Sequence, residues 1–144
     1  SDRAFRLLRQ MIPGIDSDDY RRRGQLPVYI PNYYRGAYYQ FPRTAGRSSQ
    51  LFNTGTVAWV YRSIVEQLFG LKGTPGGLCV SPRLPSHWET ARAIRQFRGA
   101  QFEVSYRRQT PSDETIVTLD GQRIDGNTIR NIERGRHYLV DVQC

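Results

Sequence analysis

The segment FNTGTVAW places two threonines and a glycine directly before an apolar run of the chain. If that run is a helix, Thr54, Gly55 and Thr56 lie at its start. Free backbone N–H groups and the positive end of the helix dipole favour an anion at such a position. Gly55 would let a ligand oxygen approach the backbone closely, and Thr54 or Thr56 could donate a hydroxyl hydrogen. These residues form a candidate anion site, although on their chemistry alone an ordinary helix cap is the commoner arrangement.

The sequence around this candidate site is rich in arginine and poor in acid. No Asp or Glu occurs between Asp19 and Glu66. Seven arginines lie in the same stretch: Arg21, Arg22, Arg23, Arg35, Arg43, Arg47 and Arg62. Such a segment produces a local positive field that attracts anions, unless carboxylates elsewhere pair with it. Arg43 and Arg47 flank a loop next to the candidate site, where they could bind an acidic substrate group, assist the anion, or simply hold the loop.

The composition limits the class of protein. Of the 144 residues, 38% are hydrophobic and 12% aromatic, which suffices for a packed core and argues against disorder. No run approaches the roughly 20 apolar residues of a membrane span. The net charge of +8 suits a nucleic-acid-binding module, but Lys72 is the only lysine, and an arginine preference also follows from a GC-rich genome. Cys79 and Cys144 lack metal-ligand spacing, and both a disulfide and free thiols in a reducing cytoplasm fit them.

A complete catalytic site is not visible in the sequence. The two histidines, His87 and His137, are far apart and flanked by strand or turn signals, so a structural or surface role is expected for each. Asp120 and Asp125 fall in turn motifs, and Glu103 lies on an alternating strand. No GxxxxGK[ST] phosphate fingerprint occurs. The residues alone therefore predict no catalytic group, no metal and no cofactor in this chain.

Two helices are predicted, and the second one carries the candidate site. Residues 3–12 repeat apolar side chains at helical spacing and end at a Pro-Gly pair. A wider apolar face begins at Thr54 and comprises Val57, Val60, Tyr61, Ile64, Val65 and Leu68. Asn53 or Thr54 suits the N-cap, and Gly70 suits the C-terminal stop. A helix this apolar is expected to be packed on most sides.

After the segment KGTPGG, the hydrophobic period changes to two, which is typical of strands. The alternating segments are QFEVSYR, ETIVTLD and YLVDV, and hairpin or turn signals lie at Gly99, Asp120-Gly121 and Asp125-Gly126. The predicted core residues are Phe102, Val104, Tyr106, Val117, Leu119, Val140 and Val142. We expect an antiparallel β-sandwich, or part of one, over about residues 78–144, with a boundary near residues 72–77.

Three blocks within about residues 50–107 resemble one enzyme family. They are LFNTGTVAWVYRSIVEQLFGLKG, GLCVSPRLPSHW and IRQFRGAQFEVSYRR. In their order and spacing they are similar to the C-terminal end of the inverting glycoside phosphorylases grouped with cellobiose and chitobiose phosphorylase (glycoside hydrolase family 94). The segment PNYYRGAYYQFPRTAGRSSQLFNTGT resembles most the branch of this family that acts on cellobionic acid.

The resemblance implies an architecture and a site. Residues 1–73 would form the C-terminal part of an (α/α)6 catalytic barrel, and residues 74–144 a C-terminal antiparallel β-sandwich domain, making the chain an α+β fragment. In the family a Thr-Gly pair at a helix start binds phosphate, and it matches Thr54 and Gly55. The general acid Asp and a phosphate-binding His and Arg lie upstream in the family, so the chain alone is expected to be inactive.

The resemblance also implies a reaction. Cellobionic acid would be cleaved by inorganic phosphate with inversion, giving α-D-glucose 1-phosphate and D-gluconate, with phosphate as a substrate and no cofactor. Phosphate replaces the water of an inverting hydrolase, so a single acidic residue suffices. The implied partners are the disaccharide, phosphate, the upstream part of the polypeptide and a second copy in a homodimer, with no nucleic acid and no membrane. The implied location is the cytoplasm.

Other readings stay open at this point. The enzyme could act on cellobiose or another β-glucoside within the same family. The β-sandwich could instead be a non-catalytic carbohydrate-binding domain, with Trp88 and the tyrosines as stacking platforms. A basic module that binds RNA or DNA is the third reading, and salt-dependent oligonucleotide binding would support it.

Overall fold

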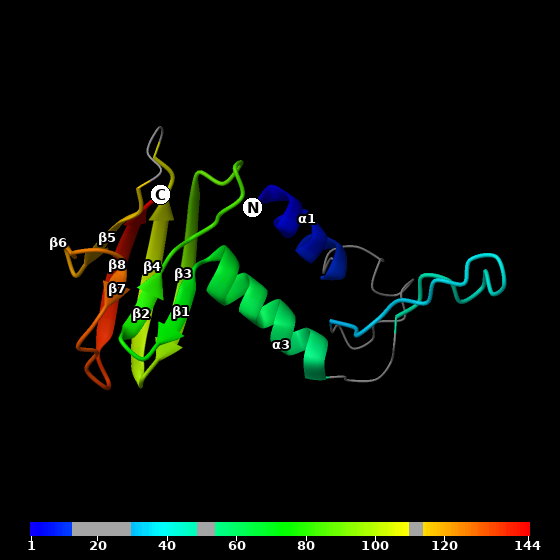
Figure 1. Ribbon diagram of the computed structural model, residues 1–144, viewed down its shortest axis with the longest axis horizontal. Helices are drawn as coiled ribbons and strands as arrows, with labels where there is room; N and C mark the ends of the chain where they lie inside the picture. The colour runs from blue at the N-terminus through cyan, green and yellow to red at the C-terminus, as the bar shows by residue number, and fades with distance from the viewer. Residues whose placement is uncertain (13–29, 49–53, 110–113) are drawn as a thin grey trace. The chain divides into compact units, whose positions relative to one another are not determined.

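The computed structural model describes residues 1–12, 30–48, 54–109 and 114–144 of the chain (Figure 1). The chain forms two compact units. The first comprises Arg3–Arg62, and the second comprises Ser1–Asp2 and Ser63–Cys144. None of the helices in the described ranges is long and apolar enough to cross a membrane.

The first unit consists of helix α1 (Asp2–Met11), a closed loop and helix α3 (Thr54–Arg62). The loop is closed by a β-bridge between Tyr34 and Ser48, next to reciprocal backbone contacts between residues 35 and 46–47. The Tyr34 hydroxyl donates to the carbonyl oxygen of Met11 at 3.4 Å, which attaches the loop to the end of α1. Both predicted helices are therefore present in the structure.

One expectation about the second helix is wrong for the described residues. Its apolar composition predicts packing on most sides, yet Trp59 is 68% exposed and Tyr61 is 51% exposed. Among the residues of α3 whose burial is described, Val60 is the buried one. The physical reason is that α1 and one loop, the other described parts of this unit, are too few to surround a helix.

The helix changes its hydrogen-bonding pattern where the second unit begins. After Arg62 the chain continues as a short π-helix, η1 (Ser63–Leu68), and Phe69 donates its N–H to the carbonyl oxygen of Ile64 at 2.9 Å. Gly70 then ends the helix with φ of +69°, the left-handed conformation usual at a helix C-terminus. The predicted stop at Gly70 is confirmed, whereas the π-turn has no signal in the sequence.

The rest of the second unit is built from two β-sheets (Figure 1). The three-stranded sheet has the order β1-β2-β7, with β1 at Leu71–Thr74, β2 at Gly77–Val80 and β7 at Thr128–Ile129. The five-stranded sheet has the order β3-β4-β8-β5-β6. Its strands are β3 (Thr90–Phe97), β4 (Ala100–Arg107), β5 (Ile116–Leu119), β6 (Gln122–Arg123) and β8 (His137–Gln143).

Two of the predicted turns form hairpins as expected. At the β3–β4 turn, Arg98 and Gly99 have φ of 51° and 77°, and at the β5–β6 turn Asp120 and Gly121 have φ of 48° and 83°. Two successive residues with positive φ match the right-handed twist of the flanking strands, which is why hairpins favour this turn.

The prediction of a purely antiparallel sandwich needs correction. Strands β4 and β8 pair in parallel, with Val104 opposite Val140, at the centre of an otherwise antiparallel five-stranded sheet. Alternation of period two reports which face of a strand is buried, but it carries no information on strand direction. The finding is therefore two sheets of mostly antiparallel strands that share one core.

The core between the sheets is close to the one predicted. Six of the seven predicted residues are buried, and Leu119 is partly buried against the others. Leu71, Leu78, Val80 and Ile129 contribute from the three-stranded sheet. The rings of Phe102 and Tyr138 stack at a centroid distance of 4.9 Å.

Candidate functional site

The first turn of α3 has an exposed glycine and carries no acidic residue. Thr54 is the first residue of the helix, and Gly55 in the same turn is exposed. A Cβ added to Gly55 would meet no atom of the described residues within 4 Å, so none of these residues covers the backbone there. The first N–H groups of a helix have no partner within the helix, and no acidic residue of this turn competes for them, so the turn suits an anion.

The neighbouring hydroxyl group already has an acceptor. Thr56 donates to Oδ1 of Asn32 at 2.6 Å, which connects the start of α3 to the base of the closed loop. The sequence left Thr54 and Thr56 as alternative hydroxyl donors, and this contact uses the Thr56 hydrogen within the protein. Asn32 is a residue that sequence reasoning missed, since nothing in the segment PNYY indicates a contact with a helix that begins more than twenty residues later.

The two arginines proposed for an acidic substrate lie in the closed loop. Arg43 and Arg47 are exposed, and Arg47 takes part in the loop closure only through its backbone, whose carbonyl oxygen accepts the N–H of Arg35 at 2.8 Å. Neither guanidinium has an ion pair with a residue that the structure describes. No hydrogen bond joins them to the first turn of α3 within the described ranges. Asn53, the alternative N-cap, and Arg21, Arg22 and Arg23 lie outside the described residues.

Within its described residues, the second unit does not bring the candidate titratable side chains together in one site. His87 and His137 are both exposed, and Glu103 pairs with Arg92 and lies 3.6 Å from His137. Within the described parts of the chain, no group of three or more His, Cys, Asp or Glu side chains could hold a metal ion. The sequence predicted a structural or a surface role for each histidine, and both lie at the surface.

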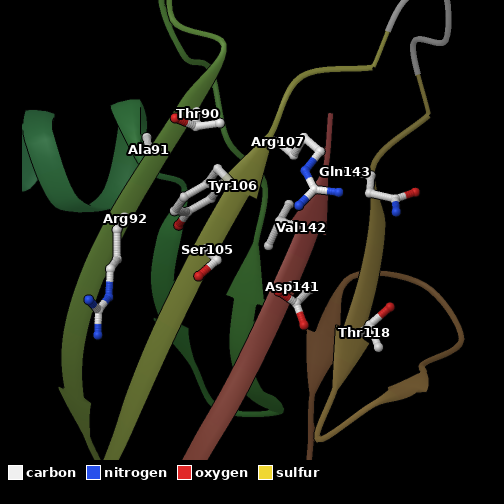
Figure 2. Close-up of a pocket in the computed structure, with 10 residues that line it drawn as sticks. All are labelled: Thr90, Ala91, Arg92, Ser105, Tyr106, Arg107, Thr118, Asp141, Val142 and Gln143. Atoms are coloured by element: carbon white, nitrogen blue, oxygen red, sulfur yellow. The ribbon is translucent and has the colours of Figure 1, made fainter.

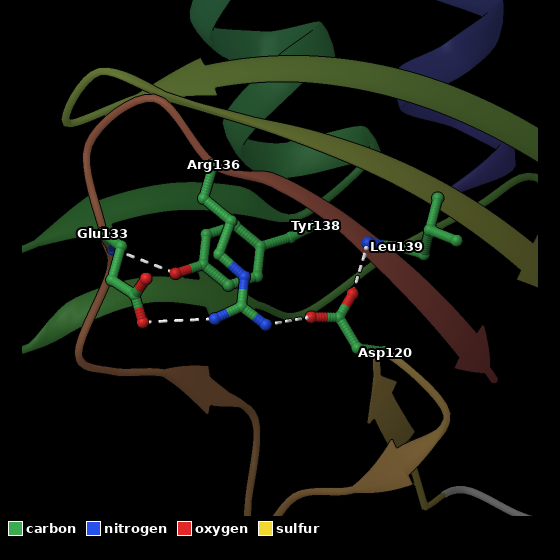
Figure 3. A network of polar contacts seen from close by, with 5 residues as sticks. All are labelled: Asp120, Glu133, Arg136, Tyr138 and Leu139. Atoms are coloured by element: carbon green, nitrogen blue, oxygen red, sulfur yellow. Dashed lines mark hydrogen bonds and ion pairs between the residues drawn. The ribbon is translucent and has the colours of Figure 1, made fainter.

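Asp120 belongs to a structural network rather than to a catalytic pair (Figure 3). Its Oδ1 accepts the N–H of Leu139 at 2.9 Å, and its Oδ2 accepts from Arg136 at 2.9 Å. Arg136 also donates to Glu133 at 3.1 Å and lies over the ring of Tyr138. The hydrogen bond to Asp120 raises the pKa of Arg136, with Glu133 adding to the effect. The network fastens the β5–β6 turn to the segment that leads into β8.

Tyr106 anchors the end of η1 to the five-stranded sheet. Its hydroxyl donates to the carbonyl oxygen of Phe69 at 2.8 Å, and the two rings lie 5.7 Å apart. Burial raises the pKa of Tyr106, so the phenol stays protonated and keeps this donor. Both cysteines are free, and burial also raises the pKa of the Cys144 thiol, which makes it a poor nucleophile.

Arg108 organises the loop before β3, a role that sequence reasoning missed. Its guanidinium donates to the carbonyl oxygens of Pro85 at 2.7 Å and Trp88 at 3.1 Å. Trp88 is partly buried, packs against the core and lies 6.1 Å from the ring of Phe69. No sequence signal separates Arg108 from Arg107, because only the fold brings the loop beside the end of β4.

Comparison with known proteins places the chain among carbohydrate-active enzymes. No family model matches it. A cellobionic acid phosphorylase from Neurospora crassa is 54% identical over 141 residues, 98% of this chain. A 3-O-β-D-glucopyranosyl-β-D-glucuronide phosphorylase from Paenibacillus borealis is 30% identical over 97% of the chain, and an N,N'-diacetylchitobiose phosphorylase from Vibrio proteolyticus is 27% identical over 87%.

The matches run through almost the whole chain but only a small part of each relative. The chain spans 18%, 18% and 16% of the lengths of these three proteins. The match to the Neurospora crassa protein covers both compact units. By sequence, the chain thus belongs to the family of disaccharide phosphorylases.

Proposed function

We propose that this chain is part of a phosphorylase that cleaves cellobionic acid with inorganic phosphate, and that the start of α3 contributes to phosphate binding. The products are α-D-glucose 1-phosphate and D-gluconate, formed with inversion. The 54% identity to a cellobionic acid phosphorylase is the observation that carries the substrate. The names of two of the relatives denote acidic sugars, which favours an acidic acceptor over cellobiose.

The role of the helix start is supported by its geometry. Phosphate must be held in line with the anomeric carbon while one oxygen stays free to attack, and fixed donors achieve this without loss of side-chain entropy. Backbone N–H groups of the open first turn are such donors, and Gly55 leaves their approach unobstructed. Arg43 and Arg47 supply guanidinium groups for the carboxylate of the acceptor.

The remaining parts of the proposal follow from the same resemblance. Residues 1–73 would complete an (α/α)6 barrel, and residues 74–144 would form its C-terminal domain. The general acid lies in another part of the protein, so incubation of this chain with cellobionic acid and phosphate is expected to yield no glucose 1-phosphate. The enzyme acts in the cytoplasm as a homodimer, without a cofactor.

The phosphate site is tested in the intact enzyme with Thr54→Val and Gly55→Val. Loss of one hydrogen bond to a charged ligand costs about 1.5–3 kcal/mol, so Thr54→Val should weaken phosphate use by about tenfold or more. Gly55→Val adds bulk on the side from which phosphate approaches, and its effect should be larger. A Cβ at Gly55 meets no atom within 4 Å among the residues that the structure describes, so no overlap with them accounts for such a loss.

Gly76→Val is the matched control. Gly76 lies between β1 and β2, and a Cβ there meets only Thr74 Oγ1 at 3.9 Å, an ordinary contact. Its phosphate kinetics should equal those of the wild type. Unchanged phosphate kinetics in a folded Thr54→Val enzyme would exclude the Thr54 hydroxyl as a donor, and unchanged kinetics in Gly55→Val as well would remove the site.

The acceptor preference is tested separately with Arg47→Ala. We expect use of cellobionic acid to fall more than use of cellobiose, because only the first substrate carries a carboxylate for the guanidinium. Equal losses on both substrates would assign Arg47 to phosphate or to the loop, and the preference for an acidic sugar would need another source.

A further inference from the structure

A second pocket, far from the helix start in sequence, lies on the outer face of the five-stranded sheet (Figure 2). Its volume is about 690 Å³. The side chains of alternate residues on β4 and β8, such as Phe102 and Val140, are buried on the other face, so the pocket faces solvent. Polar residues from four strands line it, among them Arg92, Ser105, Arg107, Thr118, Asp141 and Gln143. We call this the sheet-face pocket.

The strand register arranges these side chains in two rows. Ser105, Asp141 and Thr118 lie opposite one another on β4, β8 and β5, and Arg107 lies opposite Gln143 in the next row. Neighbouring strands are roughly 5 Å apart, and same-face residues along a strand roughly 7 Å apart. Polar groups at these spacings can contact the substituents around one hexose ring.

The charges in the sheet-face pocket are not all satisfied within the protein. Arg92 pairs with Glu103, and the side-chain oxygen of Gln143 accepts from Gln109 at 2.9 Å. By contrast, the guanidinium of Arg107 and the carboxylate of Asp141 have no hydrogen bond or ion pair with any described residue. The pocket thus offers the cation of Arg107 and the anion of Asp141, which do not pair with each other. It also offers the Ser105 hydroxyl.

This combination selects among ligand classes. A carboxylate such as Asp141 accepts hydrogen bonds from neighbouring sugar hydroxyls, and an arginine binds a ligand carboxylate with two parallel bonds. Tyr106 is the aromatic residue among the lining residues, but it is buried and donates to Phe69, so it offers no stacking face to a base or a neutral glycan.

We propose that the sheet-face pocket is a binding site for a hydroxylated sugar that carries one carboxylate, such as an aldonate or a uronate. Arg107 binds the carboxylate, and Asp141 with Ser105 and Thr118 binds the hydroxyl groups. The site shares no residue with the proposed phosphate site at α3 and takes no part in bond cleavage. Binding itself is argued from the pocket, whereas the choice of a sugar acid over other hydroxylated acids rests on the proposed function.

The test is a binding titration of the 144-residue chain followed by amide NMR shifts, with no turnover required. The ligands are D-gluconate, D-glucuronate and cellobionate, with D-glucose, cellobiose and acetate as controls. An open pocket with few charged contacts predicts saturable binding with a Kd on the order of 1 mM. The shifts should concentrate on β4, β8 and the facing part of β5.

Variants assign the ligand groups. Arg107→Gln should raise the Kd for gluconate by about tenfold or more, because a charge-assisted bidentate contact is lost, and Asp141→Asn should weaken the hydroxyl contacts. Arg130→Gln and Asp125→Asn make the same charge changes at exposed positions outside the sheet-face pocket and should leave the Kd unchanged.

Three results would overturn the proposal. They are the absence of saturable shifts with all three acids, equal shifts with acetate or with the neutral sugars, and equal weakening by Arg107→Gln and Arg130→Gln. Failure of the proposed function is a different observation, namely an intact enzyme that does not phosphorolyse cellobionic acid. Saturable sugar-acid binding that depends on Arg107 would support the sheet-face pocket in either case.

Discussion

Replacement of Gly70 by alanine should destabilise the second unit far more than a comparable change elsewhere. Gly70 has φ of +69°, a conformation that costs a residue with a Cβ about 1–2 kcal/mol. The added Cβ would also lie 2.1 Å from the carbonyl carbon of Ser81 and 2.4 Å from the nitrogen of Pro82. These are backbone atoms and cannot rotate away, so overpacking adds about 1–3 kcal/mol, towards the upper end.

The expected loss is therefore about 3–5 kcal/mol, the sum of the backbone and overpacking costs. Relief would require the two segments to separate, which breaks the hydrogen bonds from Ser81 N–H to the Gly70 oxygen and from Arg83 N–H to the Leu68 oxygen, both 2.9 Å long. The strand β1 begins at the next residue, so displacement would also disturb the buried Leu71.

Gly126→Ala is the matched control, because Gly126 has the same φ of +69° and open space around its Cβ position. It should lose only the backbone cost of about 1–2 kcal/mol. The assay is urea unfolding of the 144-residue chain followed by circular dichroism, together with hydrogen exchange of the β4 and β8 amides. Equal losses in the two variants would refute the steric argument and leave only the backbone conformation.

Three further predictions concern the second unit. Tyr106→Phe should lower the free energy of unfolding by about 1 kcal/mol at neutral pH through loss of the bond to Phe69. Because its folded pKa is raised, the wild type should lose stability as the pH rises above about 10, and the variant should lose less; equal slopes at high pH would contradict this. Asp120→Asn should cost no more than about 1 kcal/mol, shrinking in 1 M salt, since the pair with Arg136 is partly exposed; a salt-independent loss would assign the effect to backbone geometry. Arg108→Met should speed amide exchange in residues 84–89, and unchanged exchange there would remove its role in the loop.

The elements that the sequence predicts well are those whose signal is local. The hairpin at Gly99 was predictable because a positive φ after an alternating strand favours glycine, and the buried face of β4 follows from the alternation of Phe102, Val104 and Tyr106. The helix end at Gly70 follows from the same backbone chemistry. Each of these depends on neighbours within a few positions along the chain.

What the sequence could not predict depends on distant partners. The parallel direction of β8 is set by the path of the chain between residues 108 and 136, which alternation does not encode. The π-turn of η1 accompanies the anchoring of Phe69 by Tyr106, thirty-seven positions later in the chain. In the candidate site, Gly55 was identified from its residue type, whereas the contact from Thr56 to Asn32 required the closed loop.

The parallel pairing of β4 with β8 has a consequence for how the second unit folds. The hairpins β3–β4 and β5–β6 contact each other within the five-stranded sheet only through β8, which lies between them. Either hairpin can form from local contacts. The central strand β8, however, pairs with β4 only after a long loop has closed, and such closure is slow. Val140, at the middle of β8, should therefore influence the folding rate more than the unfolding rate. Until β8 pairs with them, β4 and β5 have unpaired strand edges. The chain should therefore aggregate most readily before β8 is in place.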